Sequence, residues 1–259
     1  MARITLLTDF GTQDGYIGAM KGVIASIFPG VVVDDVSHSI EPGDIDGAGR
    51  ALVRYWNRYP PGTAHVVVVD PGVGTERRAL AMEGERRFVV APDNGLLSRV
   101  LGLSSNSSIV SLENPEFLLP QQSQTFHGRD VFAPAAAYLA RGVHLSRLGP
   151  QVTDPVRIEE PAPTKEGGSI VGQVVALDRF GNLLTNLPGD SVDEGSDVEI
   201  EGRLIPVVRA YGDIHSGAVA ALVNSDGQVE VAANERSAAE LLKAEVGTRV
   251  CVPGLGDAS

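Results

Sequence analysis

The sequence predicts a two-domain α/β protein of 259 residues: a Rossmann-like N-terminal α/β domain over residues 1–160 and a smaller C-terminal all-β barrel over residues 161–259. Three observations predict this division. Up to about residue 150, short β-rich runs alternate with helical patterns, which is typical of layered α/β folds. Proline, glycine and charged residues then crowd residues 155–169 and indicate a linker. Beyond it, short strands are separated by Gly, Asn and Asp turns, as in a small barrel or sandwich.

The elements expected in the N-terminal domain follow from the spacing of apolar residues. Residues 15–28 place apolar side chains at helical spacing and stop at Pro29-Gly30, so they predict a helix. Residues 65–70, "HVVVVD", are apolar without alternation, as expected of a strand covered on both faces. The same criteria predict the remaining elements: strands at 4–9 and 31–37, helices at 44–59 and 129–141, and a hairpin with a following loop at 78–95.

The C-terminal domain is expected to consist of short strands and one helix. Turn residues bound each of these strands, and the pattern favours a closed or nearly closed sheet. The strands are expected at 169–178, 197–202, 203–212, 218–227, 228–234 and 248–254, and the helix at 237–245.

Composition and charge exclude several classes of function. The net charge of −12 argues against a nucleic-acid partner, because phosphate binding needs clustered Lys and Arg. The acidity fits either a soluble surface or a cationic ligand. The single cysteine, Cys251, excludes an internal disulfide framework and a cysteine-based zinc site. No apolar run reaches the roughly 20 residues of a membrane span, and "MARITLLTDFG" is typical of a first strand rather than a signal peptide. We therefore expect a cytoplasmic protein without membrane or nucleic-acid partners.

Three loops carry residue types suited to catalysis at the carboxyl ends of the expected strands, where open α/β sheets bind ligands. The loops are "TDFGTQDGY" with Asp9 and Asp14, "DPGVGTERR" with Asp70 and Arg77, and "TFHGRD" with His127. Each residue also has a structural explanation. Asp14 fits an N-cap of the following helix, Asp9 a turn, and Asp70 a brace for its Gly-rich loop. Arg77 fits a surface charge and His127 a structural histidine, so local sequence leaves both kinds of explanation open.

Two neighbouring patterns are weaker evidence for a site. The "PGVG" turn after residues 65–70 does not predict a P-loop, because no Lys-Ser/Thr pair follows it and a carboxylate at Asp70 would repel phosphate. In "PDNGLLS", Asp93 and Asn94 fit either turn formers or site residues.

Seven motifs resemble those of one enzyme family and occur in the family's order. They are "LLTDFGTQDGYIGAMKG", "DVSHSIEPGDI", "VVVVDPGVGTERRAL", "APDNGLLS", "TFHGRDVFAPAAAYLA", "DRFGNLLTN" and "VNSDGQVEVAAN", and they cover nearly the whole chain. One such motif would be weak evidence, whereas seven in order are specific. The chain resembles the S-adenosylmethionine hydroxide adenosyltransferases, which are related to the fluorinase and chlorinase enzymes.

This resemblance implies a fold, an assembly and a reaction. The fold is an N-terminal α/β domain followed by a C-terminal β-barrel domain, assembled as a homotrimer. The ligand is expected between the N-terminal domain of one subunit and the C-terminal domain of its neighbour. The expected reaction is hydrolysis of the substrate S-adenosyl-L-methionine by attack of water or hydroxide at C5′. It gives adenosine and L-methionine, without a metal or another cofactor.

The resemblance also assigns roles to individual residues. The hydrolases of the family carry an Asp–Arg–His set that falls on Asp70, Arg77 and His127. Phe180 and Tyr211 could instead pack in the core of the domain, which is the structural alternative to a binding role. The binding contacts carried over are Asp9 to the ribose hydroxyls, Asp14 to the methionine ammonium, Asp178 and Ser225 to the amino-acid end, Phe180 and Tyr211 flanking adenine, and Asn182 hydrogen-bonding the adenine edge.

Halide-using relatives differ at the residues that would hold the nucleophile. They have tyrosines at the positions of Asp70 and His127. The fluorinase also has a threonine and a serine where this chain has Val73 and Gly128. Loss of both hydroxyls speaks against fluoride, and a carboxylate at Asp70 repels any halide.

Two other departures concern substrate binding. The fluorinase has an arginine where this chain has Asp226, and a ribose-packing tryptophan where it has Gly43. Trp56 is not a substitute for that tryptophan by position. The resemblance therefore leaves open how the methionine carboxylate is held.

The residues support a mechanism in which only the nucleophile has to be activated. The sulfonium leaves as a neutral thioether, so the leaving group needs no general acid. The water oxygen must lie about 3 Å from C5′, in line with the C–S bond. Asp70 or His127 accepts the proton, and Arg77 favours the ionised carboxylate; the sequence leaves the choice of acceptor open. Three alternatives remain: a non-catalytic adenosine or S-adenosylmethionine sensor, an S-adenosylmethionine-dependent 5′-halogenase, and a metal-dependent hydrolase using Asp9, Asp14 and Asp70.

Overall fold

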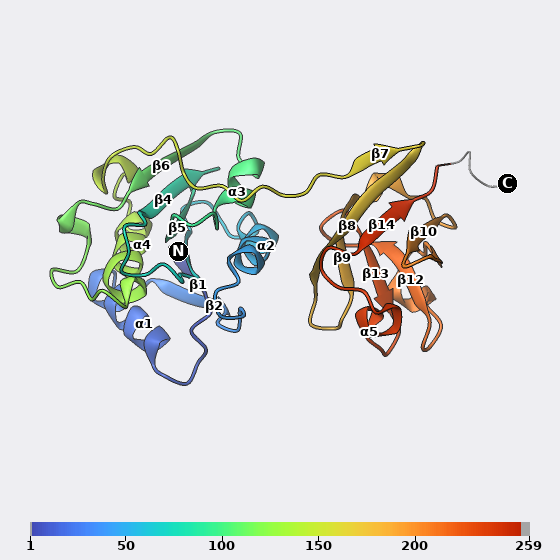
Figure 1. The fold of residues 1–259 in the computed structure, drawn as a ribbon. Coiled ribbons are helices and arrows are strands. Elements are labelled where there is room, and N and C mark those ends of the chain that lie inside the picture. The colour runs from blue at the N-terminus through green and yellow to red at the C-terminus, as the bar shows by residue number, and fades with distance from the viewer. Residues whose placement is uncertain (1, 255–259) are drawn as a thin grey trace. The chain divides into compact units, whose positions relative to one another are not determined.

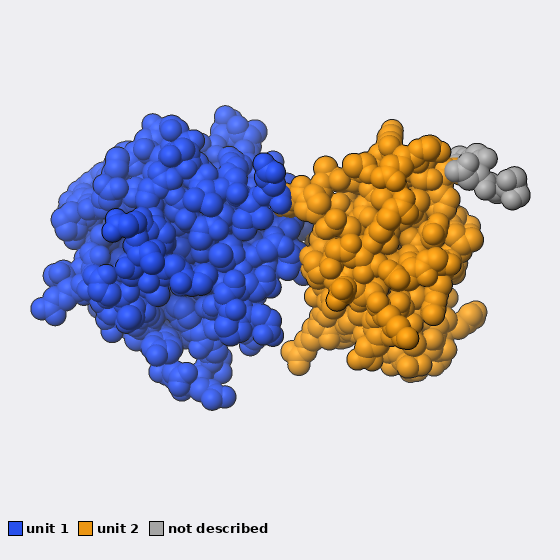
Figure 2. Space-filling model, viewed as in Figure 1, with its two compact units in different colours: residues 1–159 blue, residues 160–259 orange. Residues whose placement is uncertain are grey.

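The computed structural model describes residues 2–254, which form two compact units, one up to residue 159 and the other from residue 160 onward (Figure 2). Unit 1 is a mixed α/β structure, and unit 2 is built around a single β-sheet (Figure 1). Among the helices of residues 2–254, none is long and apolar enough to cross a membrane.

The centre of unit 1 is a six-stranded mixed sheet. Its strands are β1 (Arg3–Thr8), β2 (Val32–Ser37), β3 (Ala64–Val68), β4 (Ala79–Gly84), β5 (Arg87–Pro92) and β6 (Ser107–Ser111). The spatial order is β2-β1-β3-β5-β4-β6. The first four strands in this order run parallel, whereas β4 is antiparallel to both of its neighbours.

Helices cover both faces of this sheet (Figure 1). They are α1 (Tyr16–Ile27), α2 (Ile45–Tyr55), α3 (Ser98–Leu103) and α4 (Ala133–Ala140). Val66 and Val68 of β3 pack in the same cluster as α1 and α4, whereas Val67 packs with α2 and α3 on the other face. Alternate residues of a strand point to opposite faces, so the unbroken valine run is explained by two-sided burial, as predicted.

The order β2-β1-β3 places the carboxyl ends of β1 and β3 side by side. The two strands pair in parallel register, with Thr8 opposite Val68. The chain leaves β1 for α1 on one face and reaches β3 from α2 on the other. In open α/β sheets such a reversal opens a crevice for ligands, and here the loops beginning at Asp9 and Asp70 border it.

Several elements of unit 1 differ from the sequence prediction. The hairpin at 78–95 is present, and its turn residues Glu85 and Arg86 have φ of 48° and 62°. Two-residue hairpin turns need such left-handed conformations. α2 ends at Tyr55 and not at residue 59. The predicted helix at 129–141 is a π-helical turn, Gly128–Phe132, followed by α4. α3 and β6 were not predicted.

Unit 2 contains a nearly closed, barrel-like antiparallel sheet. Its strands are β7 (Thr164–Glu166), β8 (Ser169–Leu177), β9 (Leu183–Pro188), β10 (Asp197–Ile200), β11 (Arg203–Pro206), β12 (Val219–Val223), β13 (Gln228–Ala233) and β14 (Arg249–Val252), with one helix, α5 (Ala238–Leu242). The order is β11-β10-β14-β8-β9-β13-β12, and an isolated bridge between Val207 and Ala221 joins its two ends. The mixed α/β and barrel-like parts of the fold prediction are thus confirmed. β7 lies inside the predicted linker, and β9 was not predicted.

Candidate active site

The loop after β3 folds back on itself and brings Arg77 towards Asp70. The Val73 N–H donates to the Asp70 carbonyl at 3.2 Å, and the Thr75 hydroxyl donates to the Gly72 carbonyl at 2.7 Å. Gly74 has φ of 79°, and a Cβ there would lie 2.5 Å from the Gln124 carbonyl oxygen. Only glycine fits this conformation and this approach, so the loop docks against the segment that precedes His127.

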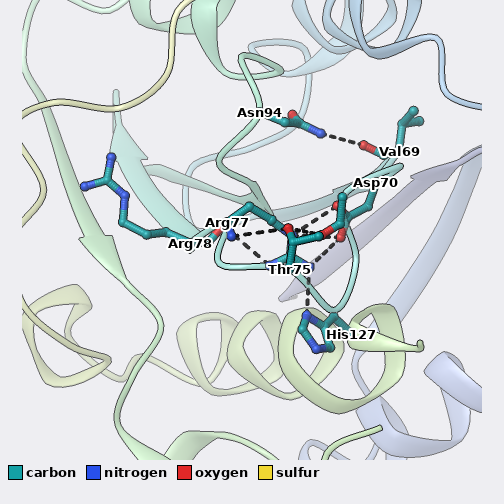
Figure 3. Close-up of polar contacts among 8 residues, drawn as sticks. Val69, Asp70, Thr75, Arg77, Arg78, Asn94 and His127 are labelled. Carbon is teal, nitrogen blue, oxygen red and sulfur yellow. Dashed lines mark hydrogen bonds and ion pairs between the residues drawn. The ribbon is translucent and has the colours of Figure 1, made fainter. Parts of the chain in front are cut away.

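Asp70 and Arg77 form a nearly buried ion pair (Figure 3). Arg77 Nε lies 3.0 Å from each carboxylate oxygen, and Nη2 also contacts Oδ2. The Arg77 guanidinium lies over the Phe132 ring, 5.4 Å from its centroid. Only 9% of the Arg77 side chain and 5% of the Asp70 side chain is exposed. Arg77 is therefore not a surface charge, and the contacts of its guanidinium fix its position.

Arg77 also contacts His127, which begins the π-helical turn before α4. Arg77 Nη2 lies 2.7 Å from His127 Nδ1 (Figure 3). Burial and the positive charge of Arg77 lower the pKa of His127, against the opposing effect of Asp70 and Asp130. An arginine can only donate hydrogen bonds, so Nδ1 is the acceptor and the neutral ring carries its proton on Nε2. The structure thus brings together all three residues of the predicted catalytic set.

Neighbouring residues hold this cluster in place. Asn94 donates from Nδ2 to the Val69 carbonyl at 2.9 Å and accepts from the Leu96 N–H, so it fixes the residue before Asp70 (Figure 3). Arg78, unlike Arg77, is partly exposed and pairs with Asp93 at 2.7 Å. Asn94 is therefore both a turn former and a support of the site.

Asp9 and Asp14, the two aspartates of the loop after β1, differ in their hydrogen bonding. Asp9 accepts a hydrogen bond from the Gly43 N–H at 2.9 Å. Asp14 is exposed, and its side chain makes no hydrogen bond or ion pair with any residue in the range 2–254. The N-cap of α1 is Gly15, with φ of 76° and no side-chain cap. The N-cap interpretation of Asp14 is therefore wrong, and its carboxylate is available to a ligand.

His38 is a support of this loop that the sequence reasoning missed. Its Nδ1 lies 2.9 Å from the Thr8 hydroxyl, and its carbonyl accepts from the Gly11 N–H at 2.8 Å. These contacts fix the residues on either side of Asp9. His38 lies in the quoted "DVSHSIEPGDI" motif, but nothing in the spacing assigned it a role.

Unit 2 contains a cavity of about 700 Å³ lined by four of the predicted binding residues, Asp178, Phe180, Asn182 and Tyr211. Phe180 is 77% exposed and Tyr211 is 53% exposed, so neither is a core residue. Asn182, in contrast, is buried. Ser225 lies in the exposed turn between β12 and β13 and is not among the described residues that line the cavity.

Internal hydrogen bonds define what the polar residues of this cavity can offer. Asp178 Oδ1 accepts from the N–H groups of Phe180 and Asn182, and Oδ2 accepts from Asn182 Nδ2 at 3.0 Å. Asp178 therefore braces the turn, and it orients the Asn182 amide so that Oδ1 remains as an acceptor. The Tyr211 hydroxyl donates to Glu230 at 2.6 Å. Burial and this carboxylate raise the pKa of Tyr211, so the phenol stays protonated.

The described residues offer no clustered metal ligands. Within residues 2–254, no group of three or more His, Cys, Asp or Glu side chains is placed to hold a metal ion. Asp9, Asp14 and Asp70, the carboxylates of the metal-dependent alternative, do not form such a group.

Comparison with known proteins identifies the family. Two protein-family models match the chain. The model described as "SAM hydroxide adenosyltransferase N-terminal domain" matches residues 4–149, and the one described as "SAM hydroxide adenosyltransferase C-terminal domain" matches residues 172–251. The chain belongs to the SAM hydroxide adenosyltransferase family. The predicted family is thereby confirmed, and the two matched ranges lie one in each compact unit.

Several relatives are similar to the chain over almost their whole length. A protein of Thermus thermophilus named "(R)-S-adenosyl-L-methionine hydrolase" is 40% identical, over 96% of this chain and 99% of its own. A protein of the same name from Salinispora tropica is 38% identical, over 96% and 97%. A "Fluorinase" of Actinoplanes sp. is 28% identical, over 96% of each chain. The crystal structure of an uncharacterized conserved protein from Thermotoga maritima has a TM-score of 0.88 and 35% identity, covering 96% of this chain and 98% of that one.

Gly128, beside His127, lies in a crowded position. A Cβ at Gly128 would lie 3.1 Å from Phe10 Cε2 and 3.3 Å from Met20 Sδ. Contacts this short require Phe10 to move before any side chain fits at 128. The packing around Gly128 therefore leaves no room for a side chain that could carry a hydroxyl group beside His127.

Proposed function

We propose that this chain hydrolyses S-adenosyl-L-methionine at C5′, giving adenosine and L-methionine. The observation that carries the proposal is the largely buried cluster in which one guanidinium holds Asp70 and half-buried His127 at the carboxyl end of β3. The names of the near-full-length relatives support the same reaction. They also specify the R configuration at the sulfonium, and we propose that form as the substrate.

The reaction needs a positioned nucleophile and little else. The water oxygen forms a bond to C5′ while the C5′–S bond breaks, and the electron pair of that bond leaves on sulfur as the neutral thioether of methionine. One water proton passes to Asp70, whose carboxylate is held ready by Arg77. The attack joins a partly anionic oxygen to a cationic substrate, so a site of low polarity favours the transition state over the separated charges.

His127 serves as a hydrogen-bond donor rather than as the base. Its Nδ1 is occupied by Arg77, and its Nε2 already carries a proton. Nε2–H can therefore orient the oxygen of the attacking water but cannot take its proton. This arrangement supports Asp70 as the proton acceptor in the proposed mechanism.

Binding roles follow the cavities and loops described above. Asp9 binds the ribose hydroxyls, and Asp14 binds the methionine ammonium. Phe180 and Tyr211 offer exposed aromatic faces to adenine, and Asn182 Oδ1 accepts from the adenine amino group. Asp178 and Ser225 serve the amino-acid end, although the three internal bonds of Asp178 favour a bracing role.

The assembly and the setting are part of the proposal. The protein acts as a homotrimer in the cytoplasm, with substrate bound between the N-terminal domain of one subunit and the C-terminal domain of its neighbour. It uses no metal or other cofactor and has no nucleic-acid or membrane partner. The strand order β2-β1-β3, with α1 and α2 on opposite faces, supports a Rossmann-like description of the N-terminal domain.

Incubation of the purified protein with each sulfonium epimer tests this function. Chromatography should show adenosine and L-methionine in equal amounts, faster from the R epimer, and at an unchanged rate in the presence of a chelator. Substrate that binds but remains intact would instead support the sensor alternative. Loss of activity with chelator, restored by a divalent metal, would overturn the metal-free mechanism.

A further inference from the structure

The turn between β8 and β9 is held rigidly in unit 2. The Asp178 N–H donates to the Asn182 carbonyl at 3.1 Å, and the Gly181 N–H donates to the Asp178 carbonyl at 3.0 Å. Gly181 has φ of 80°, its carbonyl accepts from the Ala239 N–H at 3.0 Å, and a Cβ there would overlap the Ser237 side chain. The turn is therefore closed on itself and docked on the start of α5, so the backbone of Asn182 has one fixed position.

Asp178 determines which way the Asn182 amide faces. Its Oδ1 accepts from the N–H groups of Phe180 and Asn182 at 2.8 and 2.9 Å, and its Oδ2 lies 3.0 Å from Asn182 Nδ2. An ionised carboxylate has no proton to donate, so only the NH2 end of the amide can form the bond to Oδ2. The chemistry of Asp178 therefore turns Asn182 Oδ1 away from the turn.

The Asn182 oxygen opens on the cavity of unit 2. Asn182 lines this cavity, although only 5% of the residue is exposed. Its Oδ1 accepts no hydrogen bond within residues 2–254, yet it is not among the fully buried polar atoms that lack a partner there. The exposed part of the side chain thus includes this oxygen, which offers a ligand an acceptor and no donor.

Purines differ at position 6 in a way that this oxygen distinguishes. Adenine carries an amino group there, which donates, whereas hypoxanthine and guanine carry a carbonyl oxygen, which only accepts. A carbonyl oxygen facing Asn182 Oδ1 would leave two acceptors without a proton between them. A site built to pair with a donor group rejects an analogue that lacks this group far more strongly than an apolar pocket does.

We propose that Asp178 sets the base specificity of this protein: acting through Asn182, it admits 6-amino purine nucleosides and rejects 6-oxo purine nucleosides. The inference rests on the proposed function, in which adenine lies in the cavity of unit 2. Asp178 is a positioning residue here, because it contacts the amide and not the base. Asn182 alone carries both a donor and an acceptor, so without Asp178 either group can face the base.

Asp178→Asn should reverse the amide and, with it, the preference. The two backbone N–H groups of the turn still need an acceptor, so the new side chain keeps its oxygen towards them. Its NH2 group then replaces Oδ2 and donates, so Asn182 must turn its own oxygen inward and its Nδ2 outward. The cavity then offers a donor, which pairs with a 6-oxo group but faces the donor of a 6-amino group.

The experiment compares S-adenosyl-L-methionine with S-inosyl-L-methionine, which has hypoxanthine in place of adenine and is otherwise identical. Wild-type protein should prefer the adenine substrate in kcat/KM by about 10-fold or more, mainly through KM. In Asp178→Asn the hypoxanthine substrate should become the better one, which changes the ratio by more than about 10-fold. Any contact of Asp178 with the amino-acid end leaves this ratio unaffected, because that end is the same in both substrates.

Two further variants separate this effect from a loss of charge or of structure. Asp193→Asn removes the same charge from an exposed position of unit 2 outside the described cavity lining, so it should leave the ratio unchanged. Asn182→Ala removes the amide and should bring the ratio towards 1. Adding Asp178→Asn to Asn182→Ala should then change the ratio less than about 2-fold. A larger change in that background would mean that Asp178 does not act through Asn182 and would overturn the inference.

An unchanged ratio in Asp178→Asn, or a wild-type protein without a preference, would also overturn it. Asp178→Ser provides a second variant if Asp178→Asn does not fold, because a hydroxyl still accepts from a backbone N–H but no longer holds Asn182 Nδ2. It should lower the preference without inverting it, and an unchanged preference would count against the proposal. Absence of turnover of both substrates by wild-type protein would overturn the proposed function instead. Calorimetric binding of adenosine and inosine would then still decide whether Asp178 sets the choice of base.

Discussion

The Asp70–Arg77–His127 cluster and the cavity of unit 2 prepare for a ligand in opposite ways. In the cluster, the side chains of Asp70 and Arg77 are nearly buried and are fixed by hydrogen bonds within one unit. In the cavity, Phe180 is 77% exposed and Tyr211 is 53% exposed. The groups proposed for chemistry are thus positioned before substrate arrives, whereas the groups proposed for recognition still have surface to bury.

This difference predicts two kinds of variant. Changes in the cluster should act on kcat, because preorganised groups contribute most in the transition state. Changes at the exposed rings should act on KM, because they remove binding energy that substrate and transition state share.

The largest effect is expected from Asp70→Asn. The amide keeps the shape but cannot accept the water proton, so turnover should fall by about 100-fold or more while substrate binding stays largely intact. Quenched-flow or steady-state measurement of adenosine gives kcat. Asp154→Asn is the control, because Asp154 pairs with the neighbouring Arg78 at the surface. Undiminished adenosine release from Asp70→Asn would remove Asp70 from the mechanism.

His127→Ala should show a similar loss for a different reason. The variant keeps the Asp70–Arg77 pair but removes the donor that orients the water, so kcat should again fall by about 100-fold with little change in binding. Calorimetry with substrate in the inactive variant measures the binding term. Weakened binding with unchanged kcat would place His127 in recognition and contradict the proposed role.

A comparison of Arg77→Lys with Arg78→Lys should give the next largest effect. An ammonium cannot hold both Asp70 oxygens and His127 Nδ1 at once, so kcat should fall by about 10-fold or more. Arg78 is partly exposed and holds only Asp93 and Asp154, so Arg78→Lys should change kcat less than about 3-fold. Equal losses in the two variants would show that the fixed geometry of Arg77 does not matter.

Phe180→Ala tests the other side of the comparison. Loss of an exposed stacking face should raise KM by about 10-fold with kcat and thermal stability nearly unchanged, since base stacking on an aromatic ring is worth about 1–3 kcal/mol. Leu204→Ala, at a position 62% exposed in the same unit, is the control and should change neither constant. A fall in kcat without a rise in KM would contradict the division between chemistry and recognition.

The smallest effect concerns pH. Burial and the positive charge of Arg77 lower the pKa of His127. The neutral ring therefore persists below pH 6.5, the ordinary pKa of histidine. Protonation would place an Nδ1–H against the Arg77 donor, and kcat/KM should fall only below that pH. The free energy of unfolding should also decrease as the pH falls, because the unfolded chain binds this proton at a higher pH than the folded chain. His144→Gln, at a surface histidine, should keep the acid limb, whereas a limb centred above pH 7 would contradict the assignment.

Much of the fold was predictable because single segments carry its signals. The apolar run of β3, the 78–95 hairpin and the helical spacing of α1 each depend on local pattern and burial. The π-helical turn Gly128–Phe132 was not predictable, since its apolar residues satisfy the α-helical spacing equally well. α3 and β6 are too short for periodicity to distinguish them from loops.

The site was less predictable than the fold, because its contacts join distant segments. Asp70 and Arg77 share one loop, but His127 comes from another, and only the family resemblance linked the three. Asn94 was left between two explanations; the structure shows the turn contact with Leu96 and, in addition, a bond to the Val69 carbonyl next to Asp70. His38 gave no signal, because its role depends on packing beside Thr8 rather than on spacing.

The most direct test of the central claim is hydrolysis in water enriched in ¹⁸O. If Asp70 directs water to C5′, mass spectrometry of the products should find one ¹⁸O in the 5′-hydroxyl of adenosine and none in L-methionine. Adenosine without the label, or a label in the amino-acid product, would contradict attack of water at C5′.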